Sequence, residues 1–201
     1  MTGTLQRSEL IADILDDRPE DLLVVTGLGS STYDVLELSD NPNNFYMWGA
    51  MGQSVPVGLG IAIAQPEKRV LIVTGDGELL MGLTGLSAVG NSPARNVAIL
   101  VMDNGHYSET GGQPTHTSGQ TNLAGVADQC GFPKTLEITR MSELTEAKKL
   151  LLEEEAPVMV VAKVALHTYG KLTEPQSRIG HYMAARFRMA VTGRGEAALD
   201  T

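Results

Sequence analysis

Two apolar runs, each ending in a glycine-flanked polar tip, constrain the fold of this chain more than any other feature. Val70–Val73 is a short β-branched run that leads into Gly75-Asp76-Gly77, and Asn96–Met102 leads in the same way into Asp103-Asn104-Gly105. Such runs favour buried parallel strands over helices. In open α/β sheets, ligands collect beyond the carboxyl ends of the strands. The sequence therefore predicts two neighbouring strands that deliver Asp76 and Asn104 to one crevice.

An aspartate and an asparagine at one crevice point to a metal and diphosphate site. Mg²⁺ prefers hard oxygen ligands in near-octahedral geometry and usually completes its shell with phosphates and water. Glycine-rich turns that lead into a helix offer backbone N–H groups to the same phosphates. The tripeptide Gly75-Asp76-Gly77 alone is equally compatible with an ordinary turn. The second strand, ending at Asn104, favours the metal site.

The composition is that of one α/β domain. The 201 residues are 42% hydrophobic and include 22 glycines, which fits many tight strand-to-helix turns. We predict a three-layer, doubly wound parallel sheet with helices on both faces. Residues 1–165 would form the domain, and residues 166–201 an extension that is helical and then disordered from Gly193 onward. The expected strands are Leu22–Val25, Phe45–Trp48, Val70–Val73, Asn96–Met102, Thr135–Ile138 and Pro157–Val164. The expected helices are Ser8–Leu15, Tyr33–Leu38, Gln53–Ala64, Glu78–Val89, Asn122–Cys130, Ser142–Glu155 and Ser177–Met189. Ser8 is expected to cap the first of them, and the helix Gln53–Ala64 is expected to be buried on all sides.

Charge and composition argue against several classes of protein. A net charge of −9 disfavours a nucleic-acid partner, because phosphate backbones attract basic surfaces. The single cysteine, Cys130, allows no internal disulfide and fits a reducing compartment; it is expected to be an apolar helix residue rather than a nucleophile. The amino terminus has no signal-peptide pattern, and no run reaches the roughly 18 apolar residues of a membrane span. We therefore expect a cytoplasmic protein.

Two loops are further candidates for ligand contact. The turn Thr26–Thr32 is rich in glycine and hydroxyl groups, so Gly29 and Ser30 could bind phosphate through backbone N–H groups. A plain strand-to-helix connection explains the same turn. The segment Gly105–Gln120 is long for a connection and has few apolar residues, which is typical of a functional loop. The arginines of the last predicted helix, Arg178, Arg186 and Arg188, could bind an anion, or could form a solvated face or a subunit contact.

The two strand tips resemble those of the thiamine-diphosphate enzymes. In that family the Asp and Asn of this signature bind Mg²⁺ together with a backbone carbonyl two residues beyond the Asn, here that of His106. The segments Asn44–Gly52 and Asp103–Thr115 resemble more specifically the sulfopyruvate and phosphonopyruvate decarboxylases. The resemblance extends over about residues 5–165. It implies that thiamine diphosphate and Mg²⁺ are the cofactors.

The resemblance also implies roles for individual residues. Met51 would lie beneath the cofactor and force its two rings together, although a methionine at a turn is ordinarily core filler. His106 and Glu109 depart from the family's usual small or neutral residues and join Met51 as candidate catalytic residues. The implied metal ligands are Asp76, Asn104 and His106. The implied cofactor-binding residues are Gly29, Ser30, Gly49, Met51, Gly75, Asp76, Gly77, Glu78, Asn104, His106, Tyr107 and Ser108.

By this resemblance the chain is half of a catalytic unit. The glutamate that activates the cofactor belongs to a separate pyrimidine-binding domain in this family, and neither Glu78 nor Glu109 can take that role. We therefore expect a pyrimidine-binding α-subunit as partner, in an α₂β₂ or larger assembly with the cofactor between the subunits. The expected substrate is a three-carbon 2-keto acid that carries a sulfonate or phosphonate. The groups expected to hold that anion are the hydroxyls of Ser108, Thr110 and Thr115 and the backbone N–H groups of Gly111 and Gly112.

Two other functions stay open. A carboxylate at Glu109 would repel a dianionic substrate if it pointed inward, and an outward orientation is equally compatible with the sequence. The chain could thus be a subunit of another thiamine-diphosphate lyase or carboligase, similar to acetolactate synthase or to an acyl-CoA lyase. It could also be a non-catalytic module that keeps the fold and the cofactor site.

Overall fold

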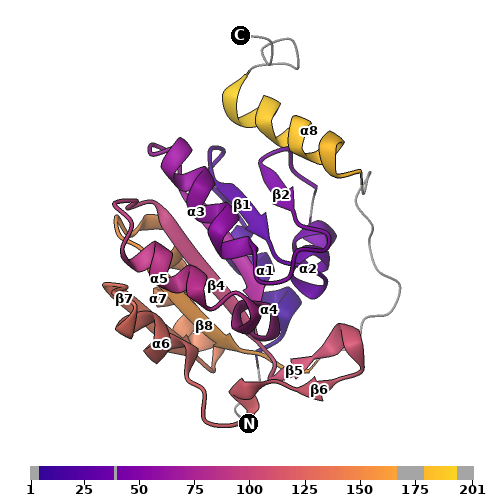
Figure 1. Cartoon of the computed structure of the whole chain (residues 1–201), viewed down its shortest axis with the longest axis vertical. Helices are drawn as coiled ribbons and strands as arrows, with labels where there is room; N and C mark the ends of the chain where they lie inside the picture. The colour runs from indigo at the N-terminus through magenta and orange to yellow at the C-terminus, as the bar shows by residue number, and fades with distance from the viewer. Residues whose placement is uncertain (1–4, 39, 167–178, 194–201) are drawn as a thin grey trace.

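The chain folds around one six-stranded parallel sheet (Figure 1). The computed structural model describes residues 5–38, 40–166 and 179–193. The strand order is β2-β1-β3-β4-β8-β7, and all five pairings are parallel. The strands are β1 Leu23–Thr26, β2 Asn44–Tyr46, β3 Val70–Gly75, β4 Val97–Asp103, β7 Lys134–Ile138 and β8 Val158–Lys163. The helices are α1 Arg7–Leu15, α2 Ser30–Leu38, α3 Ser54–Ala64, α4 Asp76–Met81, α5 Thr84–Gly90, α6 Leu123–Gln129, α7 Leu144–Glu153 and α8 Gly180–Thr192.

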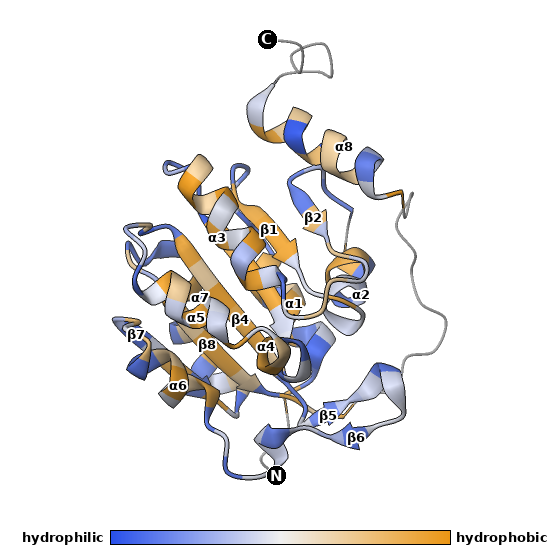
Figure 2. Ribbon diagram, viewed as in Figure 1, coloured by the Kyte–Doolittle hydropathy of each residue, from blue (hydrophilic) through white to orange (hydrophobic). Residues whose placement is uncertain are grey.

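Two hydrophobic clusters cover the two faces of the sheet, as the predicted three-layer fold requires. Because successive strand side chains point to opposite faces, Leu71 and Val73 join the cluster with α1, α2 and α7, whereas Val70 and Ile72 join the one with α3, α5 and α6. All four are fully buried. The apolar character of the central strands is plain in Figure 2. Strands that are buried on both faces read as continuous apolar runs, which is why these were predictable.

The helix expected over Glu78–Val89 is instead two helices, α4 and α5, separated by Gly82 and Leu83. The break coincides with a close backbone contact. A Cβ on Gly82 would lie 1.9 Å from the carbonyl oxygen of Gly52. Gly52 itself has a φ of +82°, a conformation that favours glycine. The local periodicity predicted one helix, but this long-range contact interrupts it.

Three other expectations need smaller corrections. Helix α1 begins at Arg7 with Gln6 as its N-cap, so Ser8 lies inside the helix and does not cap it. Helix α2 begins at Ser30, three residues before the predicted start. Helix α3 is not buried on all sides, because Ile63 is 57% exposed. Its apolar outer face is therefore open in this chain.

Helix α8 packs along the outer strand β2 (Figure 1). The rings of Phe45 and Phe187 lie 5.3 Å apart, and Arg186 Nη1 lies 2.6 Å from Asp40 Oδ2. This ion pair within the chain is none of the three roles considered for Arg186. Disorder was expected from Gly193 onward, but Gly193 is the C-cap of α8. Arg178 and residues 194–201 lie outside the described residues. The domain boundary at residue 165 stays a prediction.

Candidate functional site

The predicted site residues gather in one pocket beyond the carboxyl ends of β3 and β4. The register pairs Gly75 with Met102, so the two polar tips leave the sheet side by side. The pocket holds about 570 Å³ of empty space, part of it open to solvent. The predicted residues that line it are Ser30, Met51, Gly75, Asp76, Gly77, Glu78, Asn104, His106, Tyr107, Ser108 and Glu109. Gly29 and Gly49 do not line it. Thr110, predicted to hold the substrate anion, also lines the pocket, and the lining residues that were not predicted are Arg7, Leu28, Ser31 and Met102.

Asp76 is held by two hydroxyl groups from the loop that follows β4. Thr115 Oγ1 donates to Asp76 Oδ2 at 2.5 Å, and Thr117 Oγ1 lies 3.1 Å from the same oxygen. The residue is only 2% exposed. Burial raises the pKa of Asp76, the charge of Asp103 raises it further, and the Thr115 hydrogen bond opposes both. Without a cation, this pocket therefore disfavours the charged carboxylate.

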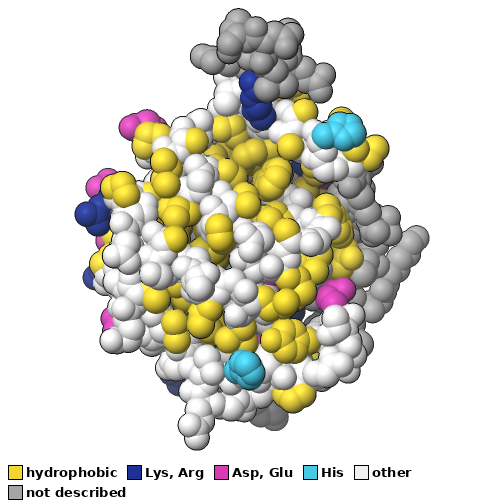
Figure 3. All heavy atoms as spheres, viewed as in Figure 1, with side chains coloured by type: hydrophobic (Ala, Val, Ile, Leu, Met, Phe, Trp, Pro, Cys, Tyr) yellow, Lys and Arg dark blue, Asp and Glu magenta, His cyan; other side chains and the backbone are white. Residues whose placement is uncertain are grey.

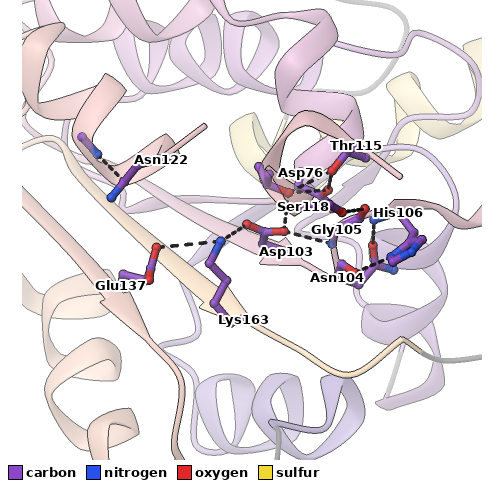
Figure 4. A network of polar contacts seen from close by, with 12 residues as sticks. Asp76, Asp103, Asn104, Gly105, His106, Thr115, Ser118, Asn122, Glu137 and Lys163 are labelled. Atoms are coloured by element: carbon purple, nitrogen blue, oxygen red, sulfur yellow. Dashed lines mark hydrogen bonds and ion pairs between the residues drawn. The ribbon is translucent and has the colours of Figure 1, made fainter. Parts of the chain in front are cut away.

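Asn104 closes the turn that carries His106 (Figure 4). Its Oδ1 accepts from the backbone N–H of His106 at 2.8 Å, and its Nδ2 donates to Ser108 Oγ at 2.9 Å. His106 Nδ1 lies 2.9 Å from the carbonyl oxygen of Asn104. Asparagine favours such turns because its side chain bonds to the backbone two residues on. The side chain and the turn therefore define each other's positions.

Glu78 braces the turn between β1 and α2. Its Oε2 accepts from the backbone N–H of Leu28 at 3.1 Å and from Thr74 Oγ1 at 3.0 Å. A Cβ on Gly27 would lie 1.5 Å from that oxygen, so a side chain there would displace the Glu78 carboxylate. Burial raises the pKa of Glu78, and hydrogen bonds from Ser54 and Thr74 oppose the shift.

The loop after β4 is ordered as a small hairpin that closes over the site. It comprises β5 His106–Tyr107, a 3₁₀ turn Ser108–Thr110, β6 Gln113–Pro114 and a second 3₁₀ turn His116–Ser118. The Tyr107 ring lies over Gly77, where a Cβ would be 2.5 Å from it. The Glu109 carboxylate lies against Gly29, 2.8 Å from where a Cβ would be. Glu109 therefore lines the pocket although it is exposed.

The predicted anion cradle in this loop does not form as expected. The backbone N–H of Gly112 donates to the Tyr107 carbonyl at 3.0 Å, so it is already used. The Thr115 hydroxyl turns to Asp76, and the Thr110 hydroxyl to Gln113 Oε1 at 3.2 Å. Three of the five predicted groups are therefore already engaged within the chain.

Comparison with known protein families decides the relationship. Residues 27–162 match the family described as thiamine pyrophosphate enzyme, C-terminal TPP binding domain. The match covers more than half of the chain and contains both polar strand tips. The chain belongs to the thiamine pyrophosphate enzymes.

Curated relatives and solved structures agree with this family. The chain is 34% identical to the sulfopyruvate decarboxylase subunit beta of Methanocaldococcus jannaschii, over 79% of this chain and 83% of that one. It is 36% identical to the phosphonopyruvate decarboxylase of Streptomyces viridochromogenes, over 89% of this chain but 44% of that one. The thiamine diphosphate-dependent 4-hydroxybenzoylformate decarboxylase of Rhodococcus jostii RHA1 matches with a TM-score of 0.71 at 22% identity, over 83% of this chain and 34% of that one. The predicted family and fold are thus confirmed. This chain spans less than half of the length of the latter two.

Several polar contacts of this thiamine pyrophosphate enzyme were not anticipated from its sequence. Arg7 Nη2 lies 2.6 Å from Asp34 Oδ2, and both side chains are almost fully buried beside the pocket. Lys163 Nζ lies 2.6 Å from Asp103 Oδ2. Nothing in the sequence marks the first pair. The sequence gives one indication of the second pair, because Asp103 directly precedes the predicted ligand Asn104.

The described residues were also considered for metal clusters and membrane-spanning helices. They contain no group of three or more His, Cys, Asp or Glu side chains that could hold a metal ion. The predicted magnesium ligands are a different set, namely one carboxylate, one amide oxygen and one backbone carbonyl. Among the same residues, no helix has both the length and the apolar character needed to span a bilayer.

Proposed function

We propose that this chain is the diphosphate-binding subunit of a thiamine-diphosphate-dependent decarboxylase of 3-sulfopyruvate or 3-phosphonopyruvate, active only with a separate pyrimidine-binding subunit. The observation that carries this proposal is the convergence of Asp76, Asn104 and His106 on one pocket at adjacent strand ends. The similarity to a sulfopyruvate decarboxylase subunit beta and to a phosphonopyruvate decarboxylase supports the substrate class.

The residues of the pocket fit a magnesium diphosphate. Carboxylate, amide and carbonyl oxygens form the hard ligand set that Mg²⁺ prefers, and Asp76, Asn104 and the backbone carbonyl of His106 would supply it. A cation there would also offset the burial that disfavours the ionised form of Asp76. Gly77 lets the Tyr107 ring close over the start of α4. The lining of the pocket therefore fits a charged ligand.

The remaining pocket residues would hold the rest of the cofactor. When bound, thiamine diphosphate supplies the electron sink for the loss of CO₂ from a 2-keto acid. Met51 would support the cofactor from below, while His106 and Glu109 would face the substrate. The other proposed contacts are Gly29, Ser30, Gly49, Gly75, Gly77, Glu78, Tyr107 and Ser108. Of these, Glu78 would act by holding the turn before Gly29, because its Oε2 accepts from Leu28.

The similarity to a subunit beta and the positions of the glutamates in the pocket support a separate partner. The Streptomyces phosphonopyruvate decarboxylase has more than twice the length that this chain matches, whereas the Methanocaldococcus subunit beta is matched over most of its length. Glu78 is engaged in bracing a turn, and Glu109 lies against Gly29. A separate subunit would therefore contribute the glutamate that activates the cofactor.

The test is reconstitution with a pyrimidine-binding partner, followed by measurement of CO₂ release from 3-sulfopyruvate, 3-phosphonopyruvate and pyruvate. We expect release from one of the two anionic substrates, and no turnover by this chain alone with saturating cofactor and Mg²⁺. Turnover by the isolated chain would contradict the need for a partner.

Replacing either side-chain ligand should remove the metal site. We expect Asp76→Ala and Asn104→Ala each to abolish Mg²⁺-dependent cofactor binding in the reconstituted pair, measured by isothermal titration calorimetry, because each removes a hard oxygen ligand. Circular dichroism should show an intact fold. Asn91→Ala, on the exposed turn after α5, is the matched control and should bind normally. Unchanged affinity in either ligand variant would remove the assignment.

A second function is favoured by Glu109. Its carboxylate lies against Gly29 and lines the pocket, where it would repel a dianionic substrate. A subunit of another thiamine-diphosphate lyase or carboligase would avoid that repulsion. CO₂ release from pyruvate alone, or the joining of two aldehydes, would favour this second function. Cofactor binding without either reaction would identify a non-catalytic module.

A further inference from the structure

A buried carboxylate outside the predicted ligand set connects the two halves of the site. Asp103, at the end of β4, is 3% exposed. Its Oδ1 accepts from Thr117 Oγ1 at 2.7 Å and from the backbone N–H of Gly105 at 3.0 Å. The same Thr117 hydroxyl lies 3.1 Å from Asp76 Oδ2. Figure 4 shows Asp103 between Lys163 and Gly105, with Asp76 nearby.

The other oxygen of Asp103 is paired with a lysine from the neighbouring strand. Residue 103 of β4 is in register with residue 163 of β8, and Lys163 Nζ lies 2.6 Å from Asp103 Oδ2. Glu137 lies on the other side of the lysine, with its Oε2 at 3.9 Å. The Lys163 side chain is 33% exposed, whereas that of Asp103 is 2% exposed. The lysine thus brings a compensating charge to a carboxylate that is otherwise enclosed.

The ion pair with Lys163 reduces the repulsion between two buried carboxylates. Asp76 and Asp103 are both buried, and each has a carboxylate oxygen within 3.1 Å of Thr117 Oγ1, so their negative charges would repel each other in a medium of low dielectric constant. Lys163 offsets the charge of Asp103 and leaves the charge of Asp76 available to a cation. Because Asp103 also accepts from Gly105, the same group orients the turn that carries Asn104 and His106.

We propose that Asp103 and Lys163 are positioning residues of the magnesium site. Asp103 holds the Thr117 hydroxyl beside Asp76 and orients Asn104 and His106 through the Gly105 N–H, while Lys163 keeps Asp103 compensated. Neither residue is a metal ligand. This inference rests on the proposed function, because it concerns the metal of the same site. Groups that orient metal ligands typically change metal affinity by about 10- to 100-fold when they are replaced.

The test is a double-mutant cycle on the reconstituted pair, with the Mg²⁺ dissociation constant measured by calorimetry at saturating thiamine diphosphate. We expect Lys163→Met and Asp103→Asn each to weaken Mg²⁺ binding about tenfold or more. The double variant should bind within about threefold of wild type, because the amide side chain at position 103 would keep an oxygen for Thr117 and Gly105 while no lone charge stays buried. Additive losses in the double variant would overturn the proposal.

A matched control separates positioning from stability. Arg186 lies on α8, away from the pocket, and Arg186→Met removes its ion pair with Asp40. This variant should lower the melting temperature without changing Mg²⁺ affinity. If Lys163→Met leaves Mg²⁺ affinity unchanged, or weakens it only as much as Arg186→Met at a similar loss of stability, the proposal fails. Failure of the wild-type pair to bind Mg²⁺ at all would instead refute the proposed function.

Discussion

At the scale of single residues, the site depends on buried acids whose charges the fold must accommodate. Asp76 is suited to a cation, since burial and the charge of Asp103 both raise its pKa and a cation would offset them. Glu78 is different, because no cation is expected beside it and its Oε2 is occupied by Leu28 and Thr74. We infer that the charge of Glu78 costs stability that its hydrogen bonds only partly recover.

Replacement of Glu78 by glutamine should therefore stabilise the chain at neutral pH. Because burial raises the folded pKa of Glu78 above its unfolded value of 4.5, the penalty is absent below that pH, grows as pH rises above it and becomes constant beyond the folded pKa. We expect Glu78→Gln to be more stable than wild type at pH 7, with a difference that disappears near pH 4. Urea unfolding at both pH values measures it.

The matched control for this prediction is Glu146→Gln, an exposed glutamate on α7. It should change stability little at either pH. A Glu78→Gln variant that is less stable than wild type at pH 7 would show that the ionised form is favoured by its surroundings.

At the scale of secondary structure, backbone contacts between distant segments decide where elements end. The strands were predictable because their apolar runs are continuous and bounded by glycine. The division into α4 and α5 was not, because it depends on the approach of Gly52 to Gly82, which are 30 positions apart in the chain. The start of α2 at Ser30 likewise follows from the left-handed Gly29, with a φ of +70°. Local periodicity carries no information on either.

A methyl group at the contact between α4 and α5 should disrupt it. We expect Gly82→Ala to lower the free energy of unfolding by about 1–3 kcal/mol, because its Cβ would meet a backbone carbonyl that cannot rotate away. Gly60→Ala on α3, where a Cβ meets nothing within 4 Å, is the control and should stabilise by about 0.5–1 kcal/mol. Chemical denaturation measures both. Equal effects of the two substitutions would contradict this explanation of the break.

At the scale of the whole molecule, one face remains apolar and open. Figure 3 shows hydrophobic side chains gathered over α3, α4 and α5. Ile63 is 57% exposed and Met81 62% exposed. Contiguous apolar surface of this kind marks interaction sites. The face begins beside the pocket, since α3 follows Met51 and α4 starts at Asp76. The Streptomyces phosphonopyruvate decarboxylase, which is a longer chain, has further sequence that could cover the corresponding face. If the chain has the separate subunit proposed above, we expect this face to contact it.

Charges on this face should weaken assembly without unfolding the chain. We expect Ile63→Lys and Met81→Lys each to raise the dissociation constant for the partner by about tenfold, because burial of an unpaired charge opposes binding. Analytical ultracentrifugation of the pair measures this. Leu38→Lys is the control, since Leu38 is 43% exposed on α2, in the opposite layer. A loss of self-association alone would mean that a second copy of this chain covers the face.

The sequence by itself determined the parallel sheet, the family and the strand tips that carry Asp76 and Asn104, because these depend on short apolar runs and on residues adjacent in the chain. Only the tertiary structure decided that Lys163 compensates Asp103, that Glu78 braces the turn at Leu28 and that α3 keeps an open face. Each of these joins or separates segments far apart in the sequence. Strand register and helix packing determine which of these distant groups come into contact, and a local pattern of residue types does not predict those contacts.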